Sequence, residues 1–207
     1  MREQDWAIQI VSQCTGRPTI LELGAHHGHD TVSIYDACKT EPVYIAVEAD
    51  SRNIPVLRSV IDDRRVVVVH AAIADHDGII AFHQCEAGDN GSGSILTPKR
   101  HLEYFPNVRF EQVTNVECIT LDSLTARYNV SEVDLIWCDI QGAERLMIAG
   151  GQRTLSKTRW LLVEADAVEM YEGQAVRAQF DGLLPDFWAI DEWPENANVL
   201  FRNRKLL

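Results

Sequence analysis

Short apolar runs rich in Val, Ile and Leu alternate along the chain with longer polar-periodic segments, and this alternation limits the possible folds more than any other feature. A continuous apolar strand must be buried on both faces, and the intervening helices can supply that cover. The pattern predicts an α/β fold with a mostly parallel sheet flanked by helices. The expected strands are 19–23, 43–47, 66–72, 79–84, 113–120, 133–140, 160–164, 188–193 and 199–202, and the expected helices are 29–38, 51–61, 121–128, 143–149 and 175–184.

Several local features refine this prediction. The run of four valines at 66–69 indicates a strand that is buried on both sides. Ser51 is the expected N-cap of the second helix, and Asp122 and Ser123 are candidate caps of the third. The last two strands are expected to form an antiparallel pair. Segment 86–94 is rich in Gly and Ser, which predicts a mobile loop, either a lid over a site or a plain surface loop.

Size and composition exclude several classes of protein. A chain of 207 residues, 46% of them hydrophobic, suits one domain spanning 1–207. No basic, apolar leader and no apolar stretch of about 18 residues occurs, so we expect a cytoplasmic protein outside the membrane. The five cysteines are scattered, which predicts reduced thiols rather than disulfides or a zinc knuckle. The net charge of −12 argues against a nucleic-acid partner.

The first expected strand leads into a glycine loop that contains Gly24 and Gly28. Glycines there allow a sharp turn and close approach of a ligand, although a lone Gly-x-x-x-Gly is often only a turn. The dinucleotide fingerprint Gly-x-Gly-x-x-Gly has a middle glycine that meets the pyrophosphate. His26 stands at that position, which argues against NAD or FAD.

Acidic and small residues at neighbouring strand ends suggest a different nucleotide. Glu22, just before the loop, can favour a cationic methionine end, and Glu48, at the next strand end, can accept hydrogen bonds from ribose hydroxyls. The stretch 72–75, which ends at Asp75, could read an adenine edge. Each signal alone fits a solvated carboxylate or a turn, but the three in order predict S-adenosylmethionine as cofactor.

Longer motifs resemble one known family. They are Ile-Leu-Glu-Leu-Gly-Ala-x-x-Gly-x-Asp from Ile20, Val-Glu-Ala-Asp from Val47, Ala-Ala-Ile-Ala-Asp-x-x-Gly from Ala71 and Asp-Leu-Ile-Trp-Cys-Asp-Ile-Gln-Gly-Ala-Glu from Asp134. Over residues 18–166 the chain resembles the FkbM family of methyltransferases. The resemblance implies a seven-stranded class I (Rossmann-like) methyltransferase sheet, S-adenosyl-L-methionine as donor, and a hydroxyl acceptor on a sugar, glycan or small natural product.

The fourth motif departs from the pattern Lys-x-Asp-x-Glu-Gly-x-Glu that is usual in the family. Trp137 stands for the lysine and Gln141 for the first glutamate, whereas Asp139 and Glu144 match. A glutamine cannot act as a base, although it can orient a hydroxyl. Trp137 is expected to pack in the core, with an acceptor wall as the alternative.

Candidate site residues follow from these motifs. The cofactor-binding candidates are Glu22, Gly24, Ala25, His26, Gly28, Glu48, Ala49, Ile73 and Asp139. For a base that takes the acceptor proton, we favour Asp139 at a strand end, then Glu144 at a helix start, then Glu164. Glu144 could equally serve only as a favourable N-terminal charge, and Glu164 could cap exposed amides.

Three histidines, His26, His27 and His29, lie close together on the cofactor loop. Imidazole is a common metal ligand, but no His-x-x-x-His or His-Glu-x-x-His spacing occurs, so no metal site is expected. One of the histidines could contact the cofactor instead.

Taken together, the residues predict an S-adenosylmethionine-dependent O-methyltransferase acting on a small-molecule or glycan acceptor. Two alternatives remain: a catalytically impaired S-adenosylmethionine-binding or scaffold protein, suggested by Gln141, and a nicotinamide-dependent oxidoreductase on a related sheet. The acceptor and the oligomeric state are left open by the sequence.

Overall fold

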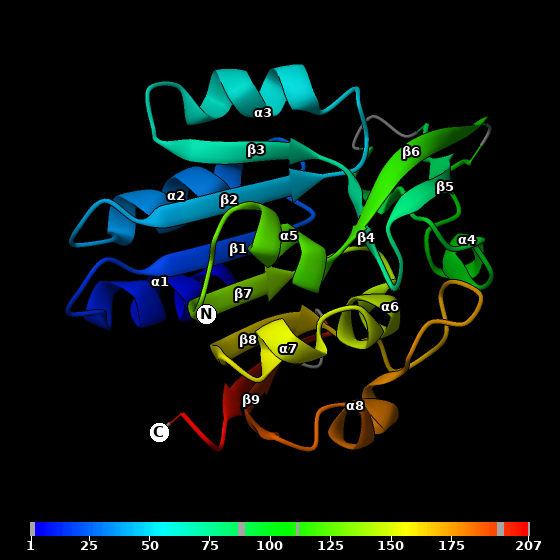
Figure 1. Ribbon diagram of the computed structural model, residues 1–207. Coiled ribbons are helices and arrows are strands. Elements are labelled where there is room, and N and C mark those ends of the chain that lie inside the picture. The colour runs from blue at the N-terminus through cyan, green and yellow to red at the C-terminus, as the bar shows by residue number, and fades with distance from the viewer. Residues whose placement is uncertain (1–2, 87–89, 111, 194–196, 207) are drawn as a thin grey trace.

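A seven-stranded sheet crosses the molecule in the computed structural model, which describes residues 3–86, 90–110, 112–193 and 197–206 (Figure 1). Its strand order is β3-β2-β1-β7-β8-β10-β9. The strands are β1 (Thr19–Leu23), β2 (Val43–Glu48), β3 (Val66–His70), β7 (Val133–Cys138), β8 (Thr158–Glu164), β9 (Phe187–Trp193) and β10 (Asn198–Asn203). Neighbours among β3, β2, β1, β7 and β8 pair in parallel, and β10 is antiparallel to both β8 and β9. The predicted α/β class and the antiparallel C-terminal pair are confirmed.

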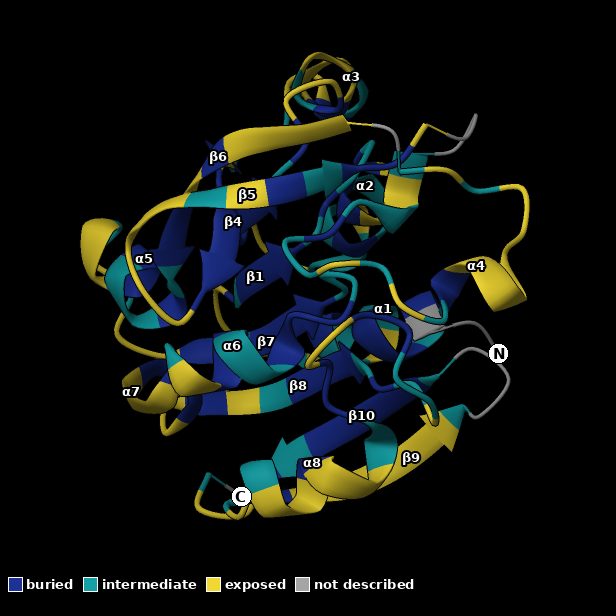
Figure 2. Ribbon diagram, turned by 90° about the vertical axis from the view of Figure 1, so that its right-hand side faces the viewer, coloured by how far each residue is buried: buried dark blue, intermediate teal, exposed yellow. Residues whose placement is uncertain are grey.

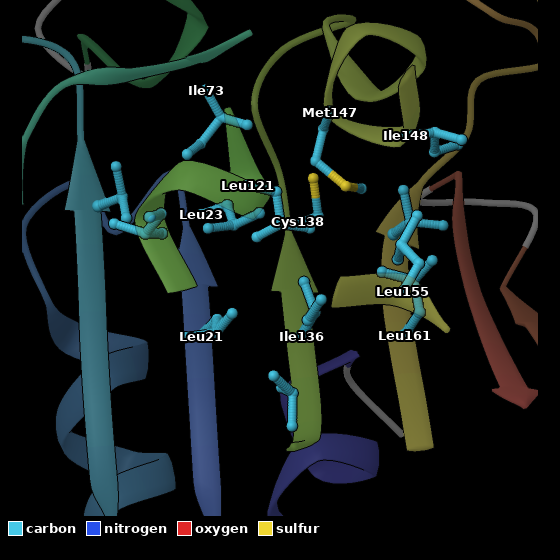
Figure 3. Close-up of a cluster of buried hydrophobic side chains, with 14 of the residues drawn as sticks. Leu21, Leu23, Ile73, Leu121, Ile136, Cys138, Met147, Ile148, Leu155 and Leu161 are labelled. Carbon is cyan, nitrogen blue, oxygen red and sulfur yellow. The ribbon is translucent and has the colours of Figure 1, made fainter. Parts of the chain in front are cut away.

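Helices cover both faces of this sheet. One face carries α1 (Glu3–Gln13), α2 (His29–Ala37) and α3 (Ile54–Ile61), and the other carries α5 (Leu121–Arg127), α6 (Glu144–Ala149), α7 (Gln152–Leu155) and α8 (Arg177–Leu183). Each face has its own hydrophobic core: the first core lies between the sheet and α1, α2 and α3, and the second lies between the sheet and α5, α6, α7 and α8. Successive strand residues point to opposite faces, so Ile20 belongs to the first core and Leu21 to the second. Figure 3 shows Leu21 and Ile136 below the strand ends and Met147 reaching down from α6.

Helix α1 was not predicted from the sequence. Trp6, Ala7 and Val11 are buried against the first core, and the Trp6 ring meets the Trp193 ring edge-on with 6.4 Å between centroids. The start of the described chain is therefore packed against β9, the strand at one edge of the seven-stranded sheet. Its apolar stripe is short, which is why the periodicity alone did not reveal it.

A second, three-stranded sheet stands beside the first, in the order β4-β6-β5. It consists of β4 (Ala72–Ala74), β5 (Gly78–Gln84) and β6 (Gln112–Thr120). The single strand predicted over 66–72 is therefore two strands in two sheets. Its predicted burial on both sides is wrong: β3 is an edge strand, with Val67 38% exposed. β-Branched residues favour a strand whether or not a neighbour covers it, so valines alone did not reveal the edge.

Both predicted helix caps are wrong. Helix α3 begins at Ile54 after Asn53, and Pro55 in its first turn prevents the helix from extending back to Ser51. Helix α5 is capped by Thr120, whose hydroxyl accepts from the Ser123 backbone N–H at 3.0 Å.

Asp122 instead accepts from the backbone N–H groups of Arg153 and Thr154, at 3.1 and 2.7 Å. These donors belong to the first turn of α7. Asp122 therefore accepts hydrogen bonds from backbone N–H groups at the start of a helix that begins 30 residues further along the chain.

The connection between β5 and β6 holds two short helical turns, η1 (Asn90–Ser92) and α4 (His101–Tyr104). Figure 2 shows α4 as mostly exposed, although its first residue, His101, is buried. The three residues of η1 are intermediate or exposed. Of the predicted loop, residues 87–89, including Asp89, lie outside the described residues. No helix in the described part of the chain is long and apolar enough to cross a membrane.

Candidate active site

A cavity of about 570 Å³ lies at the carboxyl ends of β1, β2 and β7, where ligands bind in open α/β sheets. Its walls come from three sources: the loops that follow these strands, the start of the second sheet, and the connection between β5 and β6. The lining includes Glu22, Gly24, Ala25, His26, His27, Gly28, His29, Glu48, Ala49, Asn53, Ala72, Ile73, Asn90, Ser92, Ser94, Phe105, Val108, Trp137, Asp139 and Gln141. All the predicted cofactor residues therefore share one cavity.

The glycine loop after β1 contains three residues with a left-handed φ, namely Gly24, His26 and Gly28. Gly24 has φ +92°, and a Cβ there would lie 1.8 Å from the Asp139 carbonyl oxygen. Gly28 has φ +81°, and a Cβ there would lie 2.5 Å from a methyl carbon of Leu57. The amides of Gly24 and Ala25 both donate to the Val47 carbonyl, each at 2.9 Å. Only glycine at position 24 lets the loop pass this close to the end of β7.

Glu22 is buried beneath this loop. Its Oε2 accepts from the Thr31 hydroxyl at 2.6 Å and from the Tyr44 hydroxyl at 2.8 Å. Burial outweighs these hydrogen bonds and raises the pKa of Glu22 to about 8. At neutral pH the carboxyl group is therefore largely protonated, and a cation in the cavity would favour its ionised form.

Glu48 ends β2 and organises the turn around it. Its carboxylate accepts from the His26 backbone N–H at 2.8 Å, the Asp50 backbone N–H at 2.7 Å and the Asn53 side-chain amide at 3.2 Å. Burial nevertheless raises the pKa of Glu48. A carboxylate offers about four lone-pair positions, so an acceptor position remains for a ligand hydroxyl.

A bridge of three hydrogen-bonded side chains lies in the cavity lining. The Oδ1 of Asn90, in η1, accepts from the His26 ring Nε2 at 2.8 Å, and the Asn90 amide nitrogen donates to the Asn53 side-chain oxygen at 2.7 Å. This bridge ties the Gly/Ser-rich segment to the glycine loop. Asn53 was missed by sequence reasoning, since a single asparagine after a strand carries no distinctive pattern.

Asp139 follows β7 and faces a cluster of polar groups. Its Oδ1 accepts from the Gln141 amide at 2.7 Å, and the same amide reaches Glu164 Oε2 at 3.3 Å. The Gln141 oxygen accepts from the Tyr171 hydroxyl at 2.9 Å. Burial, and next the neighbouring Asp139, raise the pKa of Glu164 well above its usual range. Tyr171 was also missed by sequence reasoning. Its hydroxyl donates to the carbonyl of Ser92, which lies 79 residues earlier in the chain.

Glu144 is 1% exposed and is not among the described residues that line the cavity. Its Oε1 accepts from the Ile140 backbone N–H at 3.2 Å, and burial raises its pKa to about 8. Glu164 is also absent from the lining and contacts two residues that belong to it, Gln141 and Asp139. The structure therefore brings Asp139 to the cavity and sets the other two candidate bases behind it.

Other residues singled out in the sequence also differ in whether they line the cavity. Ile73 lines the cavity, but Asp75 points to the surface, where His76 lies 2.8 Å from its carboxylate. Trp137 is 7% exposed and packs in the core as expected, and it also lines the cavity.

The histidine cluster lies on the cavity wall. The His26 and His27 rings stack at 3.8 Å between centroids, and His27 meets His29 edge-on. Within the described segments no three His, Cys, Asp or Glu side chains are grouped in a way that could hold a metal ion.

A sequence profile described as the methyltransferase FkbM domain matches residues 22–199. The chain belongs to the FkbM methyltransferase family. A 2-O-methyltransferase, NoeI of Sinorhizobium fredii (strain NBRC 101917 / NGR234), is 36% identical over 198 residues, covering 91% of this chain and 81% of that protein. This FkbM methyltransferase therefore uses S-adenosylmethionine as its methyl donor.

Solved structures agree on the fold. An O-methyltransferase from Bacillus cereus in complex with SAH has a TM-score of 0.57 at 15% identity, covering 96% of this chain and 79% of that one. The N-terminal domain of EvdMO1 with SAH bound has a TM-score of 0.52 at 14% identity, covering 99% and 82%. The seven-stranded sheet is thus that of class I methyltransferases, and the nicotinamide alternative is set aside.

Proposed function

We propose that this FkbM methyltransferase transfers a methyl group to a hydroxyl of a sugar or glycan, with Asp139 taking the hydroxyl proton. The observation that carries the proposal is the composition of the cavity: the cofactor loop forms one wall, polar groups of the β5–β6 connection form another, and Asp139 lies between them.

The residues of the first wall fit S-adenosylmethionine. Gly24 lets the loop lie against the end of β7, where a Cβ would collide with the Asp139 carbonyl oxygen. Glu48 can accept a hydrogen bond from a ribose hydroxyl, and Ala49 and Ile73 offer an apolar surface for the adenine ring. Glu22 is a buried acid that a cationic ligand would ionise. Ala25, His26 and Gly28 complete this wall. When bound, the cofactor supplies an electrophilic methyl group.

The second wall suits a polyhydroxylated acceptor. Asn90, Ser92 and Ser94 offer amide, carbonyl and hydroxyl groups, and Phe105, 51% exposed, presents an aromatic surface beside them. Small-molecule sites often combine an apolar lining with a few polar groups that fix orientation. The name of NoeI specifies a 2-hydroxyl, and EvdMO1 was also crystallised in the presence of D-fucose, which supports a sugar acceptor.

The chemistry required of the chain itself is positioning and proton removal. An acceptor hydroxyl must be held in line with the methyl carbon, and its proton must leave as the new bond forms. Asp139 is the carboxylate that lines the cavity directly after β7. It lies close to the glycine loop, because its backbone N–H donates to the Leu23 carbonyl at 2.9 Å. We propose that Glu164 supports Asp139 from outside the cavity lining and that Glu144 has a structural role.

The test is methyl transfer from S-adenosylmethionine labelled in the methyl group to a panel of acceptors: D-fucose and other free monosaccharides, their methyl glycosides, and simple phenols. We expect label on sugars, and Asp139→Asn should lower turnover by about 100-fold or more while SAH still binds. Label on phenols alone would exclude a sugar acceptor. Turnover that survives Asp139→Asn would exclude this base, and SAH binding without turnover on any acceptor would favour the scaffold alternative.

Phe105→Ala provides a second arm, with Tyr104→Ala as matched control, because Tyr104 is equally exposed on the same segment but does not line the cavity. We expect Phe105→Ala to raise KM for the sugar several-fold and to leave SAH affinity unchanged. Equal effects of the two variants would remove Phe105 from the acceptor site.

Two broader points belong to the same proposal. We place residues 1–207 in a single methyltransferase domain, supported by a sheet that joins residues 19–203. We also propose a cytoplasmic location, supported by five cysteines that are all free thiols.

A further inference from the structure

Gln141 lies between the two carboxyl groups that follow β7 and β8. Its amide nitrogen donates to Asp139 Oδ1 at 2.7 Å and to Glu164 Oε2 at 3.3 Å. Its side-chain oxygen accepts from the Tyr171 hydroxyl at 2.9 Å. The two N–H bonds of the Gln141 amide therefore face Asp139 and Glu164, while its oxygen shares the single Tyr171 hydroxyl hydrogen with the Ser92 carbonyl.

The backbone of Gln141 is held in an unusual conformation. Its φ is +54°, in the left-handed region, where a residue with a Cβ costs about 1–2 kcal/mol. Such a conformation persists only where the surroundings hold it. Here the Ser94 hydroxyl donates to the Gln141 carbonyl at 2.7 Å, and Gly142 continues with φ +94°. The chain thus accepts strain in order to turn this side chain toward Asp139 and Glu164.

Charge explains why an amide suits this position. Asp139 and Glu164 are close enough that Asp139 opposes ionisation of Glu164, and burial acts in the same direction. Glu164 therefore favours its neutral form beside Asp139, which is the carboxyl group of this pair that lines the cavity. An amide donates to both groups and adds no charge, whereas a carboxylate at position 141 would add a third acid and no donor.

We propose that Gln141 is a positioning residue for O-methylation, which holds the Asp139 carboxylate ready to receive a proton beside a neutral Glu164. This inference rests on the proposed function, in which Asp139 is the base. The acceptor oxygen bonds to the methyl carbon, the carbon–sulfur electron pair goes to sulfur, and the hydroxyl proton goes to Asp139. Gln141 neither gains nor loses a proton, and Tyr171 fixes its orientation.

The test compares Gln141→Met, which keeps the length and removes the donors, with Gln141→Glu, which keeps the shape and adds charge. Tyr171→Phe removes the contact of the Tyr171 hydroxyl with the amide oxygen, together with its contact with the Ser92 carbonyl. Gln152→Glu is the matched control, because Gln152 is exposed on α7, away from the cavity. For each variant, kcat and KM are measured as a function of pH with a sugar that accepts the methyl label in the panel assay. SAH affinity is measured by calorimetry.

We expect Gln141→Met to lower kcat at pH 7 by about 10- to 100-fold, with KM for S-adenosylmethionine within a factor of three. The acidic limb of the pH–kcat profile should move upward by about one pH unit in both Gln141 variants, and further in Gln141→Glu. Tyr171→Phe should lower kcat several-fold without moving that limb, and Gln152→Glu should match the wild type.

A purely structural role would change folding or SAH affinity without moving the acidic limb. If the limb stays in place in both Gln141 variants while SAH binds normally, the inference is overturned. A readout that does not need turnover is the ¹³C NMR titration of the Asp139–Glu164 pair, which should move to higher pH in Gln141→Glu. Loss of turnover in Asp139→Asn together with wild-type behaviour of the Gln141 variants would leave the base in place and refute only the positioning role.

Discussion

Replacing Gly24 by alanine tests whether the close contact between the glycine loop and β7 governs both stability and cofactor binding. Two costs add. An alanine at φ +92° costs about 1–2 kcal/mol, and its Cβ, 1.8 Å from the Asp139 carbonyl oxygen, forces the two backbones apart by more than an ångström. Overpacking of this kind costs about 1–3 kcal/mol. The free energy of unfolding should fall by about 2–5 kcal/mol, which for a chain of this size lowers Tm by about 4–20 °C.

Two other glycines separate these contributions. Gly173 has φ +81° with nothing within 4 Å of a Cβ, so Gly173→Ala measures the backbone cost alone. Gly16 has neither a left-handed φ nor a neighbour within 4 Å, so Gly16→Ala should leave stability unchanged or slightly raised. Urea denaturation of the three variants gives the free energies, and calorimetry gives SAH affinity.

The contact with β7 predicts that Gly24→Ala loses at least about 1 kcal/mol more than Gly173→Ala, and alone weakens SAH binding by about tenfold or more. If Gly24→Ala were no less stable than Gly173→Ala, the close approach to Asp139 would not be a real constraint on this loop.

Three further predictions follow from buried side chains. Burial raises the pKa of Glu22 to about 8, so the folded protein keeps a proton that the unfolded chain loses near pH 4.5. Glu22 should therefore contribute up to about 1.4 kcal/mol per pH unit to a fall in stability, measured with urea, between about pH 5 and 8. Glu22→Gln should remove this contribution and leave that of Glu144, whose pKa is also raised to about 8. Glu48→Ala removes the acceptor of the His26 and Asp50 amides and should weaken SAH binding by about tenfold or more in calorimetry, whereas Glu86→Ala, outside the cavity, should not. Trp6→Ala should cost about 3–5 kcal/mol by thermal denaturation, and a near-neutral result would refute the docking of α1.

The central strands and the cavity position could be predicted from the sequence because their signals are local. Glu22 and Glu48 are recognisable since each ends a continuous apolar strand, and parallel strands bring their carboxyl ends to one edge. The motif around Asp139 is likewise contiguous. The second sheet could not be predicted, since β4 pairs with β6 across about 40 intervening residues.

The groups behind Asp139 could not be predicted for the same reason. Tyr171 reaches Gln141 and Ser92 only after the whole sheet has formed. Glu144 and Glu164 both follow strand ends in sequence, and only packing decides that they lie behind the lining rather than in it. Sequence reasoning finds which residues can do chemistry, whereas their ranking depends on contacts between distant segments.

The connection that carries the acceptor wall leaves β5 at Gln84 and returns to β6 at Gln112, and these two residues are direct partners across the strand pair. The segment therefore departs and re-enters at a single point, so its length and content can change with little effect on chain closure. During evolution, the segment between β5 and β6 can therefore be replaced by another while the residues of the cofactor wall are retained. New acceptors can then be recruited without rebuilding the enzyme.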